Sequence, residues 1–539
     1  MNTIQIAIAQ INSTVGAIDA NCQKIAENIN KARRQNADII VFPELAITGY
    51  PPQDLIYEPG FIEKNQQALE RLLPIVSDFA ALAGFIYRDE KEMLYNAVAL
   101  IHKQKIKAII KKQLLPTYDV FDERRYFEPG ENQAPVKVEI GGRAIRLGIE
   151  ICEDLWDKNY ERKVSQNLAK QGAELIINCS ASPFSNGKAA LRRKLVQEKI
   201  SAYSIPFVYA NMVGGQDELI FDGNSFAYND KNELIHISPG FKEALNVFTI
   251  GNKPCAEPQS NPMEEMYQAL VLGIRDYFSK NGFSEAVLGL SGGIDSALVA
   301  VLAAEALGPK QLYGYSLPSQ YSSNHSLSDA EILAKNLAIH YDVIAIEPLY
   351  QAFSKALEKQ FAGTAFGIAE ENIQSRVRGT ILMSIANKFN RLALTTGNKT
   401  ELAQGYCTLY GDMAGGLAPI SDLNKTEVYA LSRYINQRSG KEIIPKGSLE
   451  KEPSAELRDN QVDPFDYPVV SPLVETMLEQ RKSHEELFAA GYDKELIKRT
   501  SRLMRLAEHK RRQAPPGLRV SENAFGSGRR MPIVNHYSE

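Results

Sequence analysis

Cysteine is scarce in this chain, which has five cysteines and one tryptophan in 539 residues. The cysteines are scattered and odd in number, and no Cys-x-x-Cys pair or histidine cluster predicts a zinc site. Few cysteines without a regular spacing are typical of a reducing compartment, so the sequence predicts a cytoplasmic protein. Their positions are Cys22, Cys152, Cys179, Cys255 and Cys407.

The chain also lacks the features of a secreted, membrane-bound or nucleic-acid-binding protein. Its first ten residues carry no basic segment and alternate like a strand, so they predict no signal peptide. No apolar run reaches the about twenty residues that span a membrane. The 61 basic and 65 acidic residues nearly balance, so no surface for polyanions is expected. We therefore expect small-molecule partners, with no nucleic acid and no membrane.

The pattern of apolar segments predicts two α/β domains joined by a linker, in keeping with the chain's length. Residues 1–250 combine many strands with few helices. Residues 251–265 contain three prolines and little apolar periodicity, which predicts a linker. Residues 266–539 begin with helices that alternate with short strands, the order typical of a doubly wound parallel sheet.

The individual elements follow from apolar periodicity. The polar stretch 437–465 predicts a long loop, either over an active site or on plain surface. In the first domain we expect strands at 4–10, 38–43, 82–87, 94–102, 145–152, 174–180, 206–211 and 224–228, and helices near 20–35, 61–73, 159–171 and 188–203, with Ile25, Ile29 and Ala32 inward. In the second domain we expect strands at 286–290, 311–316, 342–346 and 392–396.

Residues 286–301 are the most informative segment. A short apolar run, Ala-Val-Leu-Gly-Leu, predicts a buried strand, and Ser-Gly-Gly-Ile-Asp-Ser then turns into a helix. Gly292 and Gly293 lack a Cβ, which permits a tight turn and a close approach to a ligand. The amides of such a turn, with the helix dipole, form an anion site. Asp295 would repel an anion unless a cation bridges them, so the turn predicts Mg²⁺.

This turn is not a Walker loop, which requires Gly-x-x-x-x-Gly-Lys-Ser/Thr. It resembles the pyrophosphate loop of the ATP-pyrophosphatase superfamily, whose members split ATP into AMP and pyrophosphate to activate a carbonyl group. The alternative is a glycine-rich turn that binds nothing. The order of strand, turn and helix argues against that alternative.

A second set of reactive residues precedes this segment. Glu44, Lys112 and Cys152 each stand at the end of a strand-like run. A thiolate attacks an amide carbon well, but a free thiol is mostly protonated at neutral pH. A carboxylate can take that proton and later activate water. An ammonium group can stabilise the thiolate and the oxyanion that forms. The three residues therefore supply the parts of a thiol amidase.

Taken singly, a cysteine is more often a small buried residue, and a glutamate or lysine is usually solvated. The surrounding segments resemble, in this order, the nitrilase superfamily: Phe-Pro-Glu-Leu-x-x-x-Gly-Tyr, Lys-x-x-Leu-Pro-x-Tyr-x-Val-Phe-Asp-Glu and Ile-Cys-Glu-Asp-Leu-Trp. The resemblance implies a four-layer αββα sandwich with Glu44 as base, Lys112 as oxyanion-stabilising cation and Cys152 as nucleophile. It also implies that Glu123 orients the lysine.

An amidase of this kind followed by a pyrophosphate loop on one chain restricts the families that the chain could resemble. The whole chain resembles, nearly end to end, the family of bacterial glutamine-dependent NAD⁺ synthetases. One departure is Thr395, where relatives commonly have glycine, and it affects backbone freedom more than chemistry. The segments that carry the resemblance are Glu-Asn-x-Gln-x-Arg-x-Arg at 371–378, Thr-Gly-Asn-Lys-x-Glu at 396–401, and the stretches 410–416, 422–428, 453–457 and 508–511.

The resemblance implies that glutamine is hydrolysed through a Cys152 thioester and that ammonia passes to a second site. There ATP, with Mg²⁺, adenylates deamido-NAD (nicotinate adenine dinucleotide), and ammonia displaces AMP to give NAD⁺, AMP, pyrophosphate and glutamate. A homo-oligomer is also implied. The implied sites are Tyr118, Ser180 and Asn186 for glutamine; Gly289, Leu290, Ser291, Gly292, Gly293, Ile294, Asp295, Ser296, Thr396 and Lys425 for ATP; Asn372, Glu401, Asp412 and Lys510 for deamido-NAD; and Asp295 and Glu401 for Mg²⁺.

Some of these residues have plainer explanations. Thr396 and Glu401 flank a turn and could only cap a helix, Lys510 lies in a basic run that could be solvated, and Tyr118 could be a packed aromatic residue. Two other functions stay open: an ATP-pyrophosphatase amidotransferase for another carboxylate, and a non-enzymatic sensor of glutamine or nucleotide. A sensor is expected to lack a catalytic residue, whereas this chain keeps all of those named above.

Overall fold

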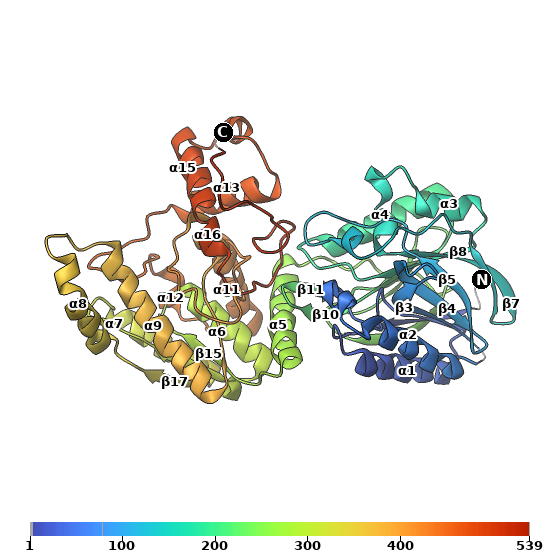
Figure 1. Cartoon of the computed structure of the whole chain (residues 1–539), viewed down its shortest axis with the longest axis horizontal. Coiled ribbons are helices and arrows are strands. Elements are labelled where there is room, and N and C mark those ends of the chain that lie inside the picture. The colour runs from blue at the N-terminus through green and yellow to red at the C-terminus, as the bar shows by residue number, and fades with distance from the viewer. Residues whose placement is uncertain (1–3, 78, 538–539) are drawn as a thin grey trace. The chain divides into compact units, whose positions relative to one another are not determined.

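The computed structural model describes residues 4–77 and 79–537. The chain divides into two compact units, Met1–Pro262 and Met263–Glu539, which follow one another along the colour bar of Figure 1. Helix α5 (Pro262–Asn281) begins inside the stretch 251–265 that the sequence suggests as a linker. Proline suits a first helical turn, because the N–H that it lacks would have no partner within the helix there.

Two six-stranded sheets of mixed direction form the framework of the first unit. Their strand orders are β14-β1-β2-β3-β4-β5 and β13-β12-β9-β8-β7-β6, and a separate hairpin pairs β10 with β11. The strands are β1 (Gln5–Gln10), β2 (Ile39–Val41), β3 (Ala80–Arg88), β4 (Leu94–His102), β5 (Lys105–Lys111), β6 (Val136–Ile140), β7 (Arg143–Ile151), β8 (Leu175–Ser180), β9 (Phe207–Asn211), β10 (Val213–Gln216), β11 (Leu219–Asp222), β12 (Phe226–Tyr228), β13 (Leu234–Ile237) and β14 (Ala244–Thr249).

Helices cover the outer face of each sheet, which gives the unit four layers (Figure 1). Helices α1 (Ile18–Arg34) and α2 (Phe61–Leu72) pack on the first sheet, and α3 (Val164–Lys170) and α4 (Lys188–Tyr203) pack on the second. Ile25, Ile29 and Ala32 of α1 are buried, as expected. The αββα sandwich that the sequence predicts is therefore confirmed.

Strand β1 shows how a simple alternation builds these layers. Ile6 and Ile8 lie in the core between the two sheets, whereas Ala7 and Ala9 belong to the cluster shared with α1. Neighbouring residues of a strand point to opposite faces, so an apolar residue at every position means that both faces are covered. The alternation of large and small residues lets the helices lie close to the sheet.

The second unit contains a four-stranded parallel sheet with the order β17-β16-β15-β18. Because β15 comes first in the chain, the strand order reverses between β15 and β18, and a ligand is expected at the carboxyl end of the strands there. This is the doubly wound arrangement that the sequence predicts. The strands are β15 (Ala286–Gly289), β16 (Leu312–Ser316), β17 (His340–Val343) and β18 (Leu392–Ala393).

Helices make up most of the rest of this unit. Helix α6 follows β15 directly, so its N-terminus lies at the carboxyl end of that strand. The helices after α5 are α6 (Ile294–Leu307), α7 (Asn324–Leu337), α8 (Glu347–Phe361), α9 (Ile368–Phe389), α10 (Lys399–Gln404), α11 (Lys425–Ser439), α12 (Lys446–Glu450), α13 (Tyr467–Glu479), α14 (His484–Ala489), α15 (Lys494–Leu506) and α16 (Glu508–Arg511).

Two strands of this sheet are displaced from, or shorter than, the sequence prediction. Strand β17 ends at Val343, and beyond it only single backbone bonds, from Ile344 and Ile346, continue toward α8. Strand β18 ends at Ala393, although Leu394 still donates its N–H to the carbonyl of Val287 in β15 at 2.9 Å and also forms an isolated bridge with Leu417. Strand β17 therefore ends where its partner β16 ends, at Ser316, whereas β18 ends before its partner β15 does. The stretch 437–465 is not wholly a loop either, because it contains the end of α11 and all of α12.

Candidate active sites

Three strand ends in the first unit bring the predicted amidase residues together. Glu44 follows β2, Lys112 comes directly after β5, and Cys152 comes directly after β7. The Nζ of Lys112 lies 2.6 Å from Glu44 Oε1 and 2.6 Å from Glu123 Oε1. Burial alone would lower the pKa of Lys112, but the two carboxylates outweigh it and hold that pKa well above its usual value. Lys112 is therefore a buried, charged cation.

The two glutamates have further donors that fix their orientation. Asn96 Nδ2 donates to Glu44 Oε1 at 2.7 Å and to Glu123 Oε2 at 3.3 Å. The backbone N–H of Ala181 donates to Glu44 Oε2 at 3.0 Å, and the hydroxyl of Tyr50 donates to Glu123 Oε1 at 2.9 Å. Burial raises the pKa of Glu123 to about 7, although the charge of Lys112 opposes this.

Cys152 has the backbone of a strained turn at the end of β7. Its φ is +41°, in the left-handed region that is costly for any residue with a side chain. Burial and the negative charge of Glu44 raise the pKa of the thiol, and Lys112 acts in the opposite direction. A thiol in this environment is neutral at rest and needs a base before it can attack, and Glu44 is the carboxylate with the largest electrostatic effect on it.

The three residues suggested for glutamine lie in different settings. The hydroxyl of Tyr118 donates to Glu153 at 3.0 and 3.1 Å, so this residue is not simply a packed aromatic. Ser180 is buried at the end of β8, and its Oγ lies 2.5 Å from Asn178 Oδ1. Asn186 is exposed in the turn before α4.

Glu153 is a site residue that the sequence alone does not predict. It directly follows Cys152, it is 4 % exposed, and its Oε1 also accepts a bond from the hydroxyl of Tyr160 at 2.9 Å. Tyr118 and Tyr160 thus hold a carboxylate beside the nucleophile. The only signal in the sequence was its position next to Cys152, because both tyrosines come from other segments.

The glycine-rich turn of the second unit has the predicted strand-turn-helix form. Gly292 has a φ of +75°, and a Cβ at this position would lie 2.2 Å from the carbonyl oxygen of Ser326. Ser291 Oγ accepts a bond from the N–H of Gly293 at 3.2 Å, and Ser296 Oγ donates to the carbonyl of Gly293 at 3.0 Å. These bonds fold the turn over the first residues of α6.

Asp295 and Glu401, the suggested Mg²⁺ ligands, both lie near Lys425. Its Nζ is 2.5 Å from Asp295 Oδ2 and 3.6 Å from Glu401 Oε1. Asn398 joins the same group, since its Nδ2 donates to Asp295 Oδ1 at 3.0 Å while its Oδ1 accepts from the N–H of Glu401 at 3.0 Å. Burial, followed by the charge of Asp295, raises the pKa of Glu401 to about 8. Glu401 thus closes a capping box on α10 and also faces the charged cluster.

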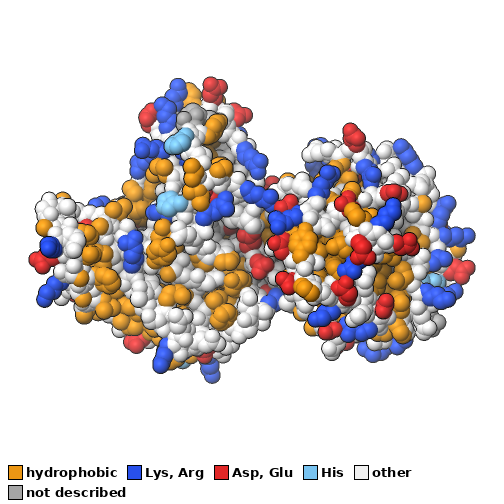
Figure 2. Space-filling view, in the orientation of Figure 1, with side chains coloured by type: hydrophobic (Ala, Val, Ile, Leu, Met, Phe, Trp, Pro, Cys, Tyr) orange, Lys and Arg blue, Asp and Glu red, His pale blue; other side chains and the backbone are white. Residues whose placement is uncertain are grey.

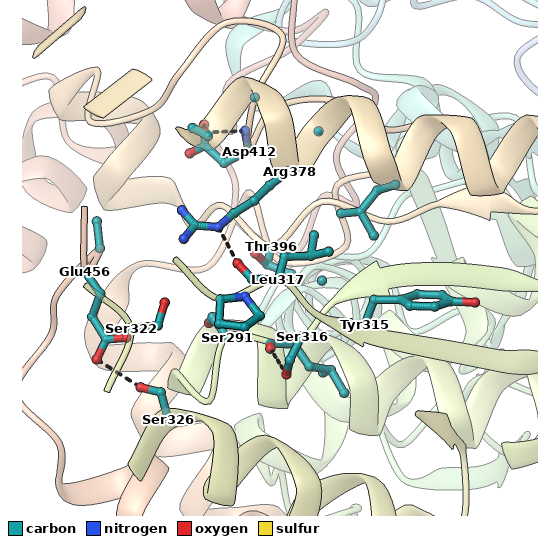
Figure 3. Close-up of a pocket in the computed structure, with 18 of the residues that line it drawn as sticks. Ser291, Tyr315, Ser316, Leu317, Ser322, Ser326, Arg378, Thr396, Asp412 and Glu456 are labelled. Carbon is teal, nitrogen blue, oxygen red and sulfur yellow. Dashed lines mark hydrogen bonds between the residues drawn. The ribbon is translucent and has the colours of Figure 1, made fainter. Parts of the chain in front are cut away.

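Two adjoining cavities open at the carboxyl end of β15. Leu290, Leu317 and Leu382 are among the apolar residues that line the first. Arg378 also lines it, and its Nε donates to the carbonyl of Leu317 at 2.9 Å (Figure 3). The second is more polar. Ser291, Thr396, Asp412, Ala455 and Glu456 line both cavities; Gly289 and Leu290 line the first, and Gly293, Ile294, Asp295, Ser296, Glu401 and Lys425 line the second.

Among the described residues, two of those suggested for deamido-NAD, Asn372 and Lys510, do not line either cavity, and of those suggested for ATP, Gly292 does not. Asn372 Oδ1 accepts a bond from Thr408 Oγ1 at 2.7 Å. Lys510 Nζ donates to the carbonyls of Gly405 and Cys407 at 2.8 and 2.7 Å, so it is not a freely solvated residue of a basic run. Both residues thus hold the loop that leads to Asp412.

The two sites define a class of protein: an amidase with a buried thiol, joined on one chain to an ATP-dependent ligase with a pyrophosphate loop. Family models agree, since residues 5–251 match carbon-nitrogen hydrolase and residues 266–514 match NAD synthase. The chain belongs to the family of glutamine-dependent NAD(+) synthetases.

Similar proteins cover almost the whole chain. A glutamine-dependent NAD(+) synthetase of Synechocystis is 44% identical over 99% of both chains. One from Thermotoga maritima is 40% identical over 100% of both. The solved structure of the Acinetobacter baumannii enzyme in complex with adenosine diphosphate is 36% identical, with a TM-score of 0.80 over 99% of this chain and 98% of that one.

Proposed function

We propose that the chain is a ligase that hydrolyses glutamine in its first unit and uses the ammonia in its second. The second unit adenylates the nicotinate carboxylate of deamido-NAD with ATP and releases pyrophosphate. Ammonia then attacks the acyl adenylate, which gives NAD⁺ and AMP. The buried group of Glu44, Lys112 and Glu123 beside Cys152 carries this proposal, because a charged lysine held by two carboxylates is otherwise a costly arrangement in a protein interior.

The amidase steps follow from the positions of the charged groups. Glu44 accepts the proton of the Cys152 thiol, and the sulfur attacks the amide carbon of glutamine. The oxyanion that forms is stabilised by the ammonium group of Lys112. Glu44 returns the proton to the departing nitrogen, which leaves as ammonia and a thioester remains. Glu44 then activates a water molecule that releases glutamate.

The carboxylate of Glu153 is suited to the α-ammonium group of glutamine. It is buried, adjacent to the nucleophile and held by two tyrosine hydroxyls. Tyr118 then acts mainly by orienting that carboxylate. Ser180 and Asn186 remain candidates for the rest of the substrate.

We place ATP across the two cavities of the second unit. The apolar walls of the first cavity suit the adenine ring, and the amides of the turn 291–296 suit the phosphates. Thr396 and Lys425 face the same space. Deamido-NAD is assigned to the side bounded by Glu401 and Asp412. Asn372 and Lys510 would act on it through the loop 405–412 that they hold.

Mg²⁺ fits the pair Asp295 and Glu401. The described residues include no group of three or more histidine, cysteine, aspartate or glutamate side chains that could hold a metal ion. Mg²⁺ at nucleotide sites needs only one or two carboxylates, because phosphate oxygens and water supply the other ligands. Once bound, Mg²⁺ offsets the charge of the phosphates and of the leaving pyrophosphate.

The remaining assignments follow from the resemblance and the composition. We propose a homo-oligomer in the cytoplasm that acts on small molecules, with residues 1–250 as the glutaminase and 266–539 as the synthetase. On the face in Figure 2, basic and acidic side chains are interspersed rather than gathered into a basic patch. None of the helices in the described part of the chain could cross a membrane.

A direct assay separates this function from an amidotransferase for another carboxylate. The purified protein is given ATP, Mg²⁺ and glutamine with deamido-NAD or with a panel of other carboxylates, and AMP, pyrophosphate and glutamate are measured. With ATP, Mg²⁺ and glutamine present, we expect rapid AMP formation with deamido-NAD and with no other carboxylate of the panel. Equal or faster AMP formation with a different carboxylate would contradict the proposed substrate.

A further inference from the structure

Asp154 is a buried carboxylate beside the nucleophile that takes no part in the steps above. It lies two residues after Cys152 in the short 3-10 turn Cys152–Leu155 and is 1 % exposed. A buried carboxylate is costly unless donors satisfy its charge. Asp154 has three such donors, and all are backbone N–H groups.

The three donors come from the two catalytic segments. Asp154 Oδ1 accepts from the N–H groups of Gln113 and Leu114 at 3.0 and 2.9 Å, directly after Lys112. Its Oδ2 accepts from the N–H of Ile151 at 2.9 Å, directly before the nucleophile. A single side chain therefore joins the backbone that carries the oxyanion-stabilising lysine to the backbone that carries the thiol.

The lysine segment leaves its sheet at this point. The N–H of Lys112 still bonds to the carbonyl of Asn96 at 2.8 Å, but strand β5 has already ended at Lys111. The next two N–H groups, at Gln113 and Leu114, bond to Asp154. The carbonyl of Lys112 also accepts a bond from the N–H of Gly130 at 2.7 Å. Beyond Lys112, the carboxylate of Asp154 fixes the direction of the chain through the next two N–H groups.

The nucleophile segment also needs an external restraint. Cys152 has a φ of +41°, and such a backbone persists only where its surroundings fix it. The N–H of Ile151 donates to Asp154, so the third residue of the turn reaches back to the residue before it. Ile151 has no polar side chain to complete a capping box, so this bond depends on Asp154 alone. The bond to Asp154 thus fixes the backbone on the N-terminal side of Cys152, next to its strained φ.

We propose that Asp154 is a positioning residue of the glutaminase: it fixes the Nζ of Lys112 and the thiol of Cys152 in the spacing that the tetrahedral intermediate requires. It does not touch the substrate and acts through the two segments that it joins. This inference rests on the proposed glutaminase function and names a residue that this function depends on. Because a misplacement of about 1 Å at a reacting centre can cost about 100-fold in rate, a loss of the clamp is expected to lower kcat.

The test compares Asp154→Asn with the same change at Asp157. Asparagine places an NH₂ group against N–H donors, so at least one of the three bonds is lost. Asp157 is also buried in this segment, but its Oδ1 pairs with Lys199 at 2.6 Å, away from the catalytic group. For Asp154→Asn we expect kcat of glutamine hydrolysis to fall about 10- to 100-fold with KM changed less than about 3-fold. Ammonia-dependent NAD⁺ synthesis should stay at the wild-type rate.

Asp157→Asn separates catalytic positioning from general stability. Asp157→Asn should lower the melting temperature about as much as Asp154→Asn does, while its kcat stays close to that of the wild type. An equal fall in kcat in both variants would overturn the proposal, as would a rise in KM with unchanged kcat in Asp154→Asn. If the wild type and Asp157→Asn also fail to hydrolyse glutamine, the proposed glutaminase function is wrong. That result differs from the ones above, which overturn only the role of Asp154.

A measurement on the unaltered protein covers the case in which Asp154→Asn does not fold. Gln113 and Leu114 lie outside any strand, and the N–H groups of both bond to Asp154, so a stable clamp should slow the exchange of their amide hydrogens. We expect them to exchange about as slowly as those of the neighbouring strand β5. Exchange at the rate of an exposed loop would overturn the proposal.

Discussion

At the residue scale, the amidase site depends on three buried charged groups that share a small space. Lys112 is 1 % exposed and lies at equal distances from Glu44 and Glu123. Removing one partner of a buried pair leaves the other charge uncompensated. The change of any one of these residues is therefore expected to affect catalysis and stability together, and a readout at the second unit is needed to tell the two apart.

Substitutions of Lys112 and of Glu44 are expected to have similar effects on glutamine-dependent synthesis. Lys112→Met and Glu44→Gln should each lower glutamine-dependent NAD⁺ synthesis by at least ~100-fold, the scale of losing an oxyanion donor or a general base. Glutamine analogues that alkylate thiols should label Cys152 slowly in both. Lys111→Met is the matched control, because Lys111 lies over the ring of Tyr95 at 3.6 Å rather than in the site. Rapid labelling in Glu44→Gln would show that another group activates the thiol.

Glu123 predicts an acid limb in the pH profile. Burial raises its pKa to about 7, so as the pH falls through this value Glu123 takes up a proton and its ion pair with Lys112 is lost. We expect kcat of glutamine hydrolysis to decline below about pH 7, with the apparent pKa belonging to the coupled group rather than to Glu123 alone. The measurement is kcat at saturating glutamine between about pH 5 and pH 9. A flat profile on the acid side would contradict this assignment.

A substitution of Asp295 is expected to have the opposite effect: synthesis is lost and glutamine hydrolysis is kept. Asp295→Asn should abolish AMP formation with either nitrogen source, because an amide binds Mg²⁺ far more weakly than a carboxylate does. Glutamine hydrolysis should survive at least in part, since that reaction uses no metal. AMP, pyrophosphate and glutamate are measured separately over a Mg²⁺ titration. A wild-type rate of AMP formation with unchanged Mg²⁺ dependence would mean that this turn does not hold the metal.

At the scale of elements, both sites lie where strands end. The pyrophosphate turn connects β15 to α6 at the point where the strand order of the parallel sheet reverses. Its shape requires Gly292, whose φ is +75° and whose missing Cβ leaves room for the carbonyl of Ser326. The turn is thus fixed by two independent demands, one on backbone conformation and one on space.

These demands can be separated with two glycine variants. Gly292→Ala should reduce NAD⁺ synthesis with glutamine or ammonium by at least ~100-fold, because the turn that donates to the phosphates must move. Gly282→Ala is the control: it has a φ of +77° but nothing within 4 Å of the added Cβ. It should lose about 1–2 kcal/mol of stability and keep its activity. Equal activity in the two variants would show that the turn is not at the ATP site.

The sequence predicted the elements of both sites better than the partners of each residue. The positions of Glu44, Lys112 and Cys152 at strand ends could be inferred, because apolar alternation is local. Asp154 and Glu153 could not be given roles, because their donors lie up to 41 residues away in the chain. The end of β18 could not be predicted either, because beyond Ala393 the chain bridges to Leu417, a distant residue, while Leu394 keeps one bond to Val287 of β15.

At the scale of the whole molecule, one chain is proposed to make ammonia at one site and to consume it at another. Protonation in water converts ammonia to unreactive ammonium, so synthesis with glutamine depends on ammonia that reaches the second reaction before it is protonated. The two sites belong to separate compact units. A substitution in one unit should therefore abolish glutamine hydrolysis or NAD⁺ synthesis without abolishing the other reaction.

The most direct test is Cys152→Ala, assayed for NAD⁺ from deamido-NAD and ATP with either glutamine or an ammonium salt. We expect synthesis with glutamine to be abolished, because the nucleophile is gone, while synthesis with ammonium stays within about 2-fold of the wild type. Retained synthesis with glutamine would contradict the role of Cys152. Loss of both activities in a folded variant would contradict the claim that the two units carry separate reactions.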